Sequence, residues 1–203
     1  MLTIGLTGIL GSGKSTVAGM FRGLGIPIVD MDEAGRWAVD NDETVRKQIA
    51  ATFGREMFDA EGNLLRQKLG NVVFSDDEKL QTLNRIVHPG MLACAQVWVD
   101  EIKQEPAAPY LIIDAALIFE LDVDTDCEAV ITVAAPLEDS IQRAMQRSGL
   151  TREDALGRID AQLSQEEKIA HSDYVIWNDT DLHTLRSRVL AIHEQLLRLS
   201  PDP

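Results

Sequence analysis

The sequence predicts an α/β fold, in which a parallel five-stranded sheet is flanked by helices. Short apolar runs of strand length recur along the chain and alternate with segments of helical periodicity, a pattern typical of parallel sheets with crossover helices. A glycine-rich loop stands directly between the first apolar run and the first helical segment. The expected strands are residues 2–6, 28–30, 110–114, 129–133 and 174–177, and helical patterns follow each of the last three.

The loop after the first strand carries the pattern G-x-x-x-x-G-K-S, which binds phosphate when it lies between a strand and a helix, as here. Glycines let backbone N–H groups approach phosphate oxygens, and the helix N-terminus adds partial positive charge. We expect Lys14 to reach the β- and γ-phosphates and Ser15 Oγ to bind Mg²⁺. The alternative is a glycine turn without a ligand. The expected nucleotide contacts here are Gly8, Gly11, Ser12, Gly13, Lys14, Ser15 and Thr16.

Two acids, Asp30 and Asp32, stand at the end of the second strand. Carboxyl ends of parallel strands surround the ligand crevice, and residues i and i+2 of an extended chain face the same way, so both carboxylates could point at the site. A small-molecule kinase needs a base beside the acceptor hydroxyl, and Asp32 suits that role. The alternative is that Asp32 caps the helix that runs through residues 34–39.

About 80 residues separate the second and third strands, which is more than a crossover requires. Helical patterns cover residues 36–53, 64–74, 78–87 and 91–103, and the last two flank His88-Pro89-Gly90. We therefore expect a single domain over residues 1–203, in which residues 1–58 and 106–203 form a nucleotide-binding core and residues 59–105 form a helical subdomain.

A lid is expected after the fourth strand. In the helical segment 137–147, Leu137 and three other apolar residues would face the core, while Asp139, Arg143 and Arg147 share another face. An anion between the two arginines would offset their repulsion; the alternative is a solvated face with an Asp139–Arg143 pair. Gly149 would act as a hinge, residues 151–168 would continue as a polar helix, and the lid would span 147–170. The final helix carries apolar residues from Leu182 to Leu196.

The composition of the chain argues against several classes of partner and site. The 203 residues include 19 basic and 33 acidic ones, a net charge of −14, which argues against a nucleic-acid partner. No signal peptide or apolar stretch of membrane-spanning length is visible, so we expect a cytoplasmic protein without a membrane partner. Cys94 and Cys127 lack the spacing of a metal or disulfide site and are expected to be buried free thiols.

The motifs together resemble the dephospho-coenzyme A kinase family, over nearly the whole chain. The resemblance rests on the phosphate loop, the D-x-D strand end, the L-N-x-I-V-H-P segment at 83–89, the Q-R-x-x-x-R segment at 142–147, Gln162 with Glu167-Lys168, and the segment 173–179. It implies a single kinase domain that transfers the ATP γ-phosphate to the 3′-hydroxyl of dephospho-CoA, with Mg²⁺, and it makes residues 59–105 the acceptor subdomain. It makes Asp32 the general base and Arg143 and Arg147 the lid arginines. We expect a monomer or weak homo-oligomer.

The resemblance also assigns, less specifically, further contacts. Lys168 and Asn178 would close the lid and line the adenine pocket. Asp30, Arg66 and Lys68 would contact the acceptor, the last two at its pantetheine-pyrophosphate end unless they are ordinary surface bases. His88 would pack the acceptor wall at a His-Pro helix kink rather than transfer a proton.

Two positions depart from the family pattern. Ile9 stands where the family has glycine, and it would be strained if that position required positive φ. Ala116 stands where the family has proline after the third strand. These departures motivate one alternative, a nucleotide-binding regulatory protein without turnover. A second alternative is another small-metabolite or nucleotide kinase, which would share Lys14, Ser15 and the lid but differ in the helical insertion.

Overall fold

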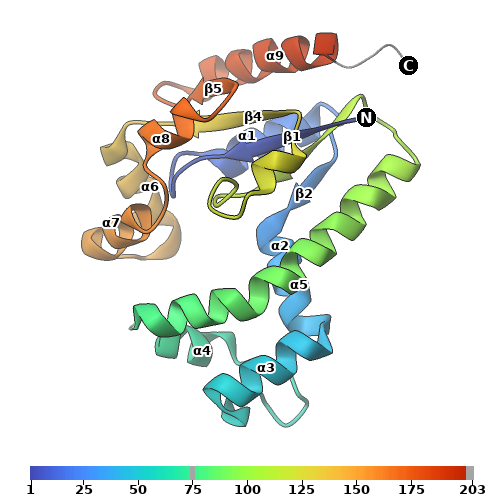
Figure 1. Cartoon of the computed structure of the whole chain (residues 1–203). Coiled ribbons are helices and arrows are strands. Elements are labelled where there is room, and N and C mark those ends of the chain that lie inside the picture. The colour runs from blue at the N-terminus through green and yellow to red at the C-terminus, as the bar shows by residue number, and fades with distance from the viewer. Residues whose placement is uncertain (74–75, 200–203) are drawn as a thin grey trace. The chain divides into compact units, whose positions relative to one another are not determined.

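The computed structural model describes residues 1–73 and 76–199. The chain divides into two compact units, the first formed by Met1–Val29 and Ile102–Pro203 and the second by Asp30–Glu101. Figure 1 traces the chain through both. The helical unit thus begins at Asp30, earlier than residue 59, where the sequence placed the start of a helical subdomain.

The sheet contains the five strands predicted from the sequence. They are β1 (Leu2–Thr7), β2 (Ile28–Asp30), β3 (Tyr110–Asp114), β4 (Ala129–Ala134) and β5 (Tyr174–Trp177), in the order β2-β3-β1-β4-β5. The pairs β1–β3, β1–β4 and β4–β5 are parallel, with Leu2 opposite Tyr110 and Ile4 opposite Ala129. Every residue of β3 and β4 is buried, as expected for central strands covered on both faces.

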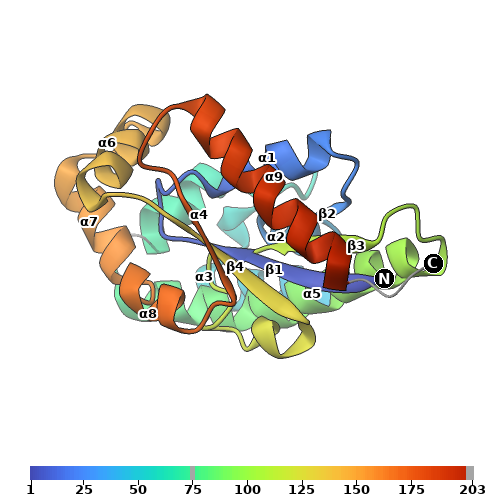
Figure 2. The ribbon, with the colours of Figure 1, turned by 90° about the horizontal axis from the view of Figure 1, so that it is seen from above.

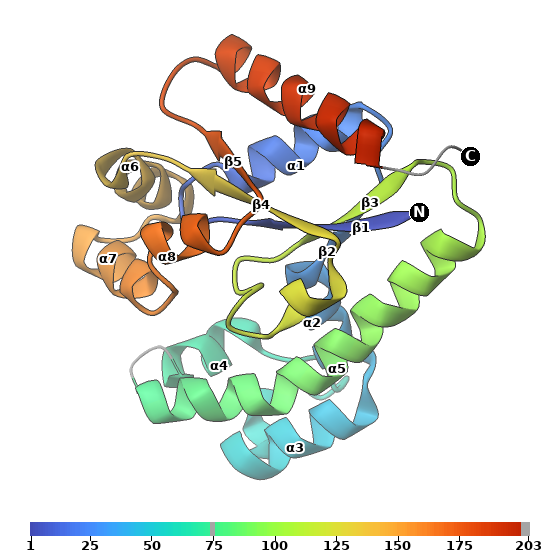
Figure 3. The ribbon, with the colours of Figure 1, turned by 45° about the horizontal axis from the view of Figure 1, so that its top comes forward.

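Helices α1 (Lys14–Gly23) and α9 (Leu182–Leu199) pack side by side on one face of the sheet (Figure 3). Their buried residues Phe21, Leu185 and Val189 join Ile4 and Ile131 of the sheet in one apolar core. Seen from above in Figure 2, α6 (Leu137–Ser148), α7 (Arg152–Asp160) and α8 (Gln165–Ala170) gather at one end of the strands, and the loop after β1 runs toward them.

Three expectations for this unit are wrong. The segment 115–128 contains only a short 3-10 helix, η2 (Val123–Asp126), so no α-helix follows β3. Leu137 is half exposed instead of facing the core, because it occupies the first turn of α6. The polar segment 151–168 forms two helices, because Thr151 and Ser164 each begin a capping box.

The second unit consists of helices around their own apolar cluster. They are α2 (Met31–Asn41), α3 (Glu43–Phe53), η1 (Arg55–Met57), α4 (Arg66–Val73) and α5 (Asp77–Gln104). Ile49, Met57, Leu69 and Val73 are buried in this cluster. The unit therefore buries apolar surface independently of the sheet.

The helix boundaries in this unit differ from the predicted ones. The segment 36–53 is split by Asp42, whose carboxylate caps α3 by accepting hydrogen bonds from the N–H groups of Thr44 and Val45. Residues 78–103 form the single helix α5 with Pro89 inside it, rather than two helices. The predicted end of the 64–74 helix, Phe74, lies outside the described residues.

The structure also tests the predictions made for the cysteines and for membrane-spanning segments. Both cysteines are free; Cys94 is buried as predicted, whereas Cys127 is only partly buried. Burial nevertheless raises the pKa of the Cys127 thiol to about 12. Within residues 1–73 and 76–199, no helix is long and apolar enough to cross a membrane.

We expect Gly19→Ala to stabilise the protein. Gly19 is exposed in the interior of α1, and an added methyl group would meet no atom within 4 Å. Because glycine costs roughly 0.5–1 kcal/mol relative to alanine inside a helix, Tm should rise by about 1–4 °C. Gly11→Ala is the opposing control, since at φ 80° its methyl group would collide with the Ser140 carbonyl. Thermal unfolding checks both; an unchanged Tm for Gly19→Ala would contradict the expectation.

Candidate active site

The phosphate loop connects β1 to α1, as predicted. Gly11 and Gly13 have φ of 80° and 101°, in the region that favours glycine. A side chain at Gly11 would collide with the Ser140 carbonyl, and one at Gly13 with the side-chain amide of Asn178. The loop therefore lies directly against α6 and against the end of β5, which only glycine permits.

Ile9 is not strained. Among the described non-glycine residues only Asp122 has positive φ, so the Ile9 backbone lies in a region open to side chains. The Ile9 side chain is 3% exposed and packs against Ile141 and Ala144 of α6 and Ala155 of α7. The departure from the family pattern thus supplies an apolar contact between the phosphate loop and helices α6 and α7.

Lys14, at the first position of α1, forms a hydrogen-bonded ion pair with Asp114 at the carboxyl end of β3. The side chains are 15% and 7% exposed, so the pair is well shielded from solvent. A shielded cation at a helix N-terminus favours a polyanion at the same place. Asp114 was identified in the sequence only as the end of a strand; its acidic character at a strand terminus was the available signal.

Two arginines of α6, Arg143 and Arg147, contact the segments beside the phosphate loop. Arg147 Nη1 lies 3.5 Å from Ser15 Oγ, and Arg143 Nη2 donates to the Asn178 carbonyl at 3.2 Å. Arg143 also pairs with Asp139 at 3.8 Å, so the alternative predicted for this face is present as well. Yet Arg143 Nη1 is buried without a hydrogen-bond partner among the described residues. A buried guanidinium nitrogen that lacks an acceptor favours an anion beside it.

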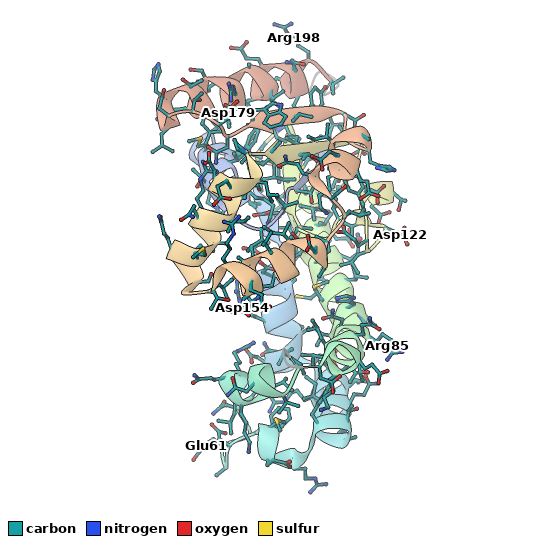
Figure 4. The ribbon with its side chains drawn as sticks, turned by 90° about the vertical axis from the view of Figure 1, so that its left-hand side faces the viewer. Glu61, Arg85, Asp122, Asp154, Asp179 and Arg198 are labelled. Atoms are coloured by element: carbon teal, nitrogen blue, oxygen red, sulfur yellow. The ribbon has the colours of Figure 1, made fainter. Side chains whose placement is uncertain are left out.

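Asn178 is 8% exposed and holds the phosphate loop, because its side-chain amide donates to the Ser12 carbonyl at 2.8 Å. The next residue, Asp179, lies beside α9 in Figure 4 and accepts a hydrogen bond from Arg188. That hydrogen bond lowers the pKa of the Asp179 carboxyl. The loop after β5 is thus anchored to both the phosphate loop and α9.

Lys168 is fully buried on α8. Its ammonium donates to the Ala116 carbonyl at 2.9 Å and to both carboxylate oxygens of Glu120, at 2.9 and 3.0 Å. The Ala116 carbonyl also accepts from Thr7 Oγ1 at 3.2 Å. In this arrangement Lys168 contacts protein acceptors, and it fixes the loop that follows Asp114 where the family pattern has proline. Sequence reasoning did not identify Glu120 as its partner.

In the second unit, Asp30 and Asp32 are not both on an extended strand end. Asp30 caps α2, since its Oδ1 accepts from the N–H groups of Asp32 and Glu33 at 2.9 and 3.1 Å. The alternative that Asp32 is the cap is therefore wrong. Asp32 is exposed in the first turn of α2.

The expected acceptor residues make contacts within the second unit. Arg66 forms an ion pair with Asp40 at 2.8 Å, and Lys68 donates to the Glu56 carbonyl at 2.8 Å. Both side chains are exposed. His88 is half-buried inside α5, and burial lowers its pKa, so it is neutral at pH 7.

Comparison with known proteins gives consistent results. A family model described as dephospho-CoA kinase matches residues 2–184. A dephospho-CoA kinase of Syntrophotalea carbinolica is 38% identical over 205 residues, covering 100% of this chain and 97% of that protein. One of Geobacillus kaustophilus is 38% identical over 198 residues, covering 96% of each.

Solved structures share the fold. The Thermus thermophilus protein TT1252 matches with a TM-score of 0.79 and 34% identity over 98% of both chains. A Campylobacter jejuni dephospho-CoA kinase matches with a TM-score of 0.73 and 24% identity over 98% of both chains. An Acinetobacter baumannii shikimate kinase, at 18% identity and a TM-score of 0.51 over 100% of this chain and 96% of its own, shares the general architecture. The phosphate loop, the parallel sheet and these matches lead to one conclusion: the chain belongs to the dephospho-CoA kinase family.

Proposed function

We propose that this chain transfers the γ-phosphate of ATP to the 3′-hydroxyl of dephospho-CoA, giving coenzyme A and ADP. The observation that carries the proposal is the set of cations around the phosphate loop of a chain with net charge −14: Lys14 and Arg147 lie at the start of α1, and Arg143 donates to Asn178, which holds the loop. Family membership supplies the acceptor.

The nucleotide side of the reaction uses the phosphate loop. The N–H groups of residues 13–15, at the start of α1, are suited to β-phosphate oxygens, whereas the Thr16 N–H donates to the Gly13 carbonyl. Lys14 exchanges Asp114 for phosphate oxygens. Ser15 Oγ is exposed beside them, and a hydroxyl next to phosphate oxygens is a donor set that Mg²⁺ prefers. Bound Mg²⁺ would neutralise charge on the phosphates.

The lid arginines stabilise the transferring group. Arg143 Nη1 is buried without a partner among the described residues and Arg147 reaches toward Ser15, so both side chains can donate to equatorial oxygens of the phosphoryl group. Asn178 keeps the loop in place through Ser12, and Lys168 supports the nucleotide site through the loop after Asp114. We assign the lid to residues 147–170.

The acceptor side uses the second unit. Asp32 orients the 3′-hydroxyl and accepts its proton late in the transfer, while Asp30 fixes the first turn of α2. Arg66, Lys68 and the neutral His88 line the acceptor site. We further infer a cytoplasmic monomer or weak homo-oligomer whose ligands are small molecules, since an acidic exterior disfavours nucleic acid and anionic membranes.

A coupled assay for ADP formation tests the function against its alternatives. The acceptors are dephospho-CoA, adenosine, AMP and none. ADP formed only with dephospho-CoA is the expected result. Turnover with adenosine or AMP instead indicates another metabolite kinase, and ATP binding without acceptor-dependent ADP indicates a regulatory protein.

Asp32→Asn should lower kcat by at least about 100-fold, because the amide cannot accept the hydroxyl proton. ATP affinity should stay within about twofold, since Asp32 is not assigned to the nucleotide. Glu33→Gln is the matched control: it removes the same charge from the same exposed helical turn. Steady-state kinetics and ATP titration check the result, and parental kcat in Asp32→Asn would remove Asp32 from the role of base.

A further inference from the structure

One side-chain hydrogen bond joins the phosphate loop to the lid. Gln162 lies between α7 and α8, and its Oε1 accepts from the Leu10 backbone N–H at 3.0 Å. The two residues are 152 positions apart in the chain, and both are part-buried. None of the roles given above to the phosphate loop, the lid or the acceptor residues uses Gln162.

With this bond, both the N–H and the carbonyl of the Ile9–Leu10 peptide group are hydrogen-bonded. The carbonyl of the Ile9–Leu10 peptide accepts from the Ser12 N–H at 3.1 Å, and the N–H of the same peptide donates to Gln162. A peptide held at both its donor and its acceptor cannot rotate without losing two hydrogen bonds. The orientation of the loop between Gly8 and Gly11 therefore depends on a side chain from the lid.

Hydrogen bonds from their backbone N–H groups hold Gln162 and its neighbour Leu163 in place. The N–H of Gln162 donates to the Ile159 carbonyl at 3.0 Å, and the N–H of Leu163 donates to Glu120 Oε1 at 2.8 Å. Glu120 is in turn held by the buried Lys168. A second contact also joins the phosphate loop to helices α6 and α7, because Ile9 packs in the apolar cluster with Ile141 and Ile159.

We propose that Gln162 is a positioning residue for phosphoryl transfer: its side-chain carbonyl sets the Ile9–Leu10 peptide and so couples the shape of the phosphate loop to the lid. The proposal rests on the kinase function proposed above. Residues 9–10 lie at the opposite end of the loop from the start of α1, which is assigned to the β-phosphate. Loss of the bond should therefore affect transfer of the γ-phosphate more than binding of ADP.

Two substitutions of similar size separate positioning from packing. Q162M keeps the volume but removes the acceptor, and kcat should fall about three- to tenfold, the effect of losing one neutral hydrogen bond. Q162E keeps an acceptor oxygen but adds a negative charge, so kcat should stay within about twofold while KM for ATP rises. If Gln162 acted only by packing, Q162M, which keeps its volume, would retain more of the parental kcat than Q162E, which adds a charge. The control Q195M changes an exposed glutamine of α9 and should leave both constants unchanged.

A second measurement, which requires no catalysis, tests the Gln162–Leu10 hydrogen bond without the phosphate acceptor. Amide hydrogen exchange of Leu10, followed by NMR in the full chain, should accelerate at least about threefold in Q162M and stay near the parental rate in Q162E and Q195M. If Q162M does not fold, Q162N, whose amide is one methylene short, takes its place. Parental Leu10 exchange or parental kcat in the acceptor-free variant would overturn the proposal. Absence of dephospho-CoA phosphorylation in the parent, with Leu10 exchange as expected, would overturn only the proposed function.

Discussion

The Lys14→Met variant is expected to phosphorylate dephospho-CoA at least about 100-fold more slowly than the parent, measured as kcat/KM for ATP. Lys14 is the cation at the start of α1, and its ion pair with Asp114 is shielded from solvent. In such surroundings a positive charge directed at a phosphoryl group contributes far more than in water. Methionine fills a similar volume but offers no charge or donor.

The same substitution also affects stability, which must be separated from catalysis. Asp114 is 7% exposed and loses its lysine partner in Lys14→Met, so the free energy of unfolding should fall by roughly 3 kcal/mol. The matched control is Lys14→Met with Asp114→Asn, which removes the negative charge as well. Tm should recover in the double variant while kcat/KM stays low. Recovery of both would show that Lys14 acts through folding alone and would contradict its role in catalysis.

The strands could be predicted because each is a short apolar run bounded by turn residues, and the sheet confirms all five. Helix boundaries could not, because they depend on single side-chain contacts. Asp42 ends one helix and caps the next, whereas Pro89, a usual helix breaker, is accommodated inside α5. The periodicity of apolar residues indicates neither the helix end at Asp42 nor the continuation of α5 through Pro89.

The phosphate loop could be predicted because its residues are adjacent in sequence. The groups that hold it could not, because each comes from a distant segment. Asp114 is 100 positions from Lys14, and Gln162 is 152 from Leu10. The Ile9 departure is explained only by the apolar partners that α6 and α7 bring to it. A polar residue at a strand end was a visible signal for Asp114. Gln162 was visible only as a position of the family pattern, which did not indicate Leu10 as its partner.

The second large effect is expected from Lys168→Met, which should lower the free energy of unfolding by roughly 3–5 kcal/mol. The Lys168 side chain is fully buried, and the Glu120 side chain is only 21% exposed. Removing the lysine leaves that carboxylate without its counter-charge, although the Leu163 N–H still donates to it. Breaking a buried pair from one side has this cost because the remaining charge stays desolvated.

Three variants determine whether the cost belongs to the ion pair. For a chain of this size Lys168→Met should lower Tm by about 6–20 °C in thermal unfolding. Lys168→Met with Glu120→Gln should recover most of that loss, because no uncompensated charge remains buried. Lys103→Met, at an exposed lysine near the end of α5, should shift Tm by no more than about 2 °C. Equal losses in the single and double variants would mean that the Lys168 stem, and not its charge, stabilises the loop after Asp114.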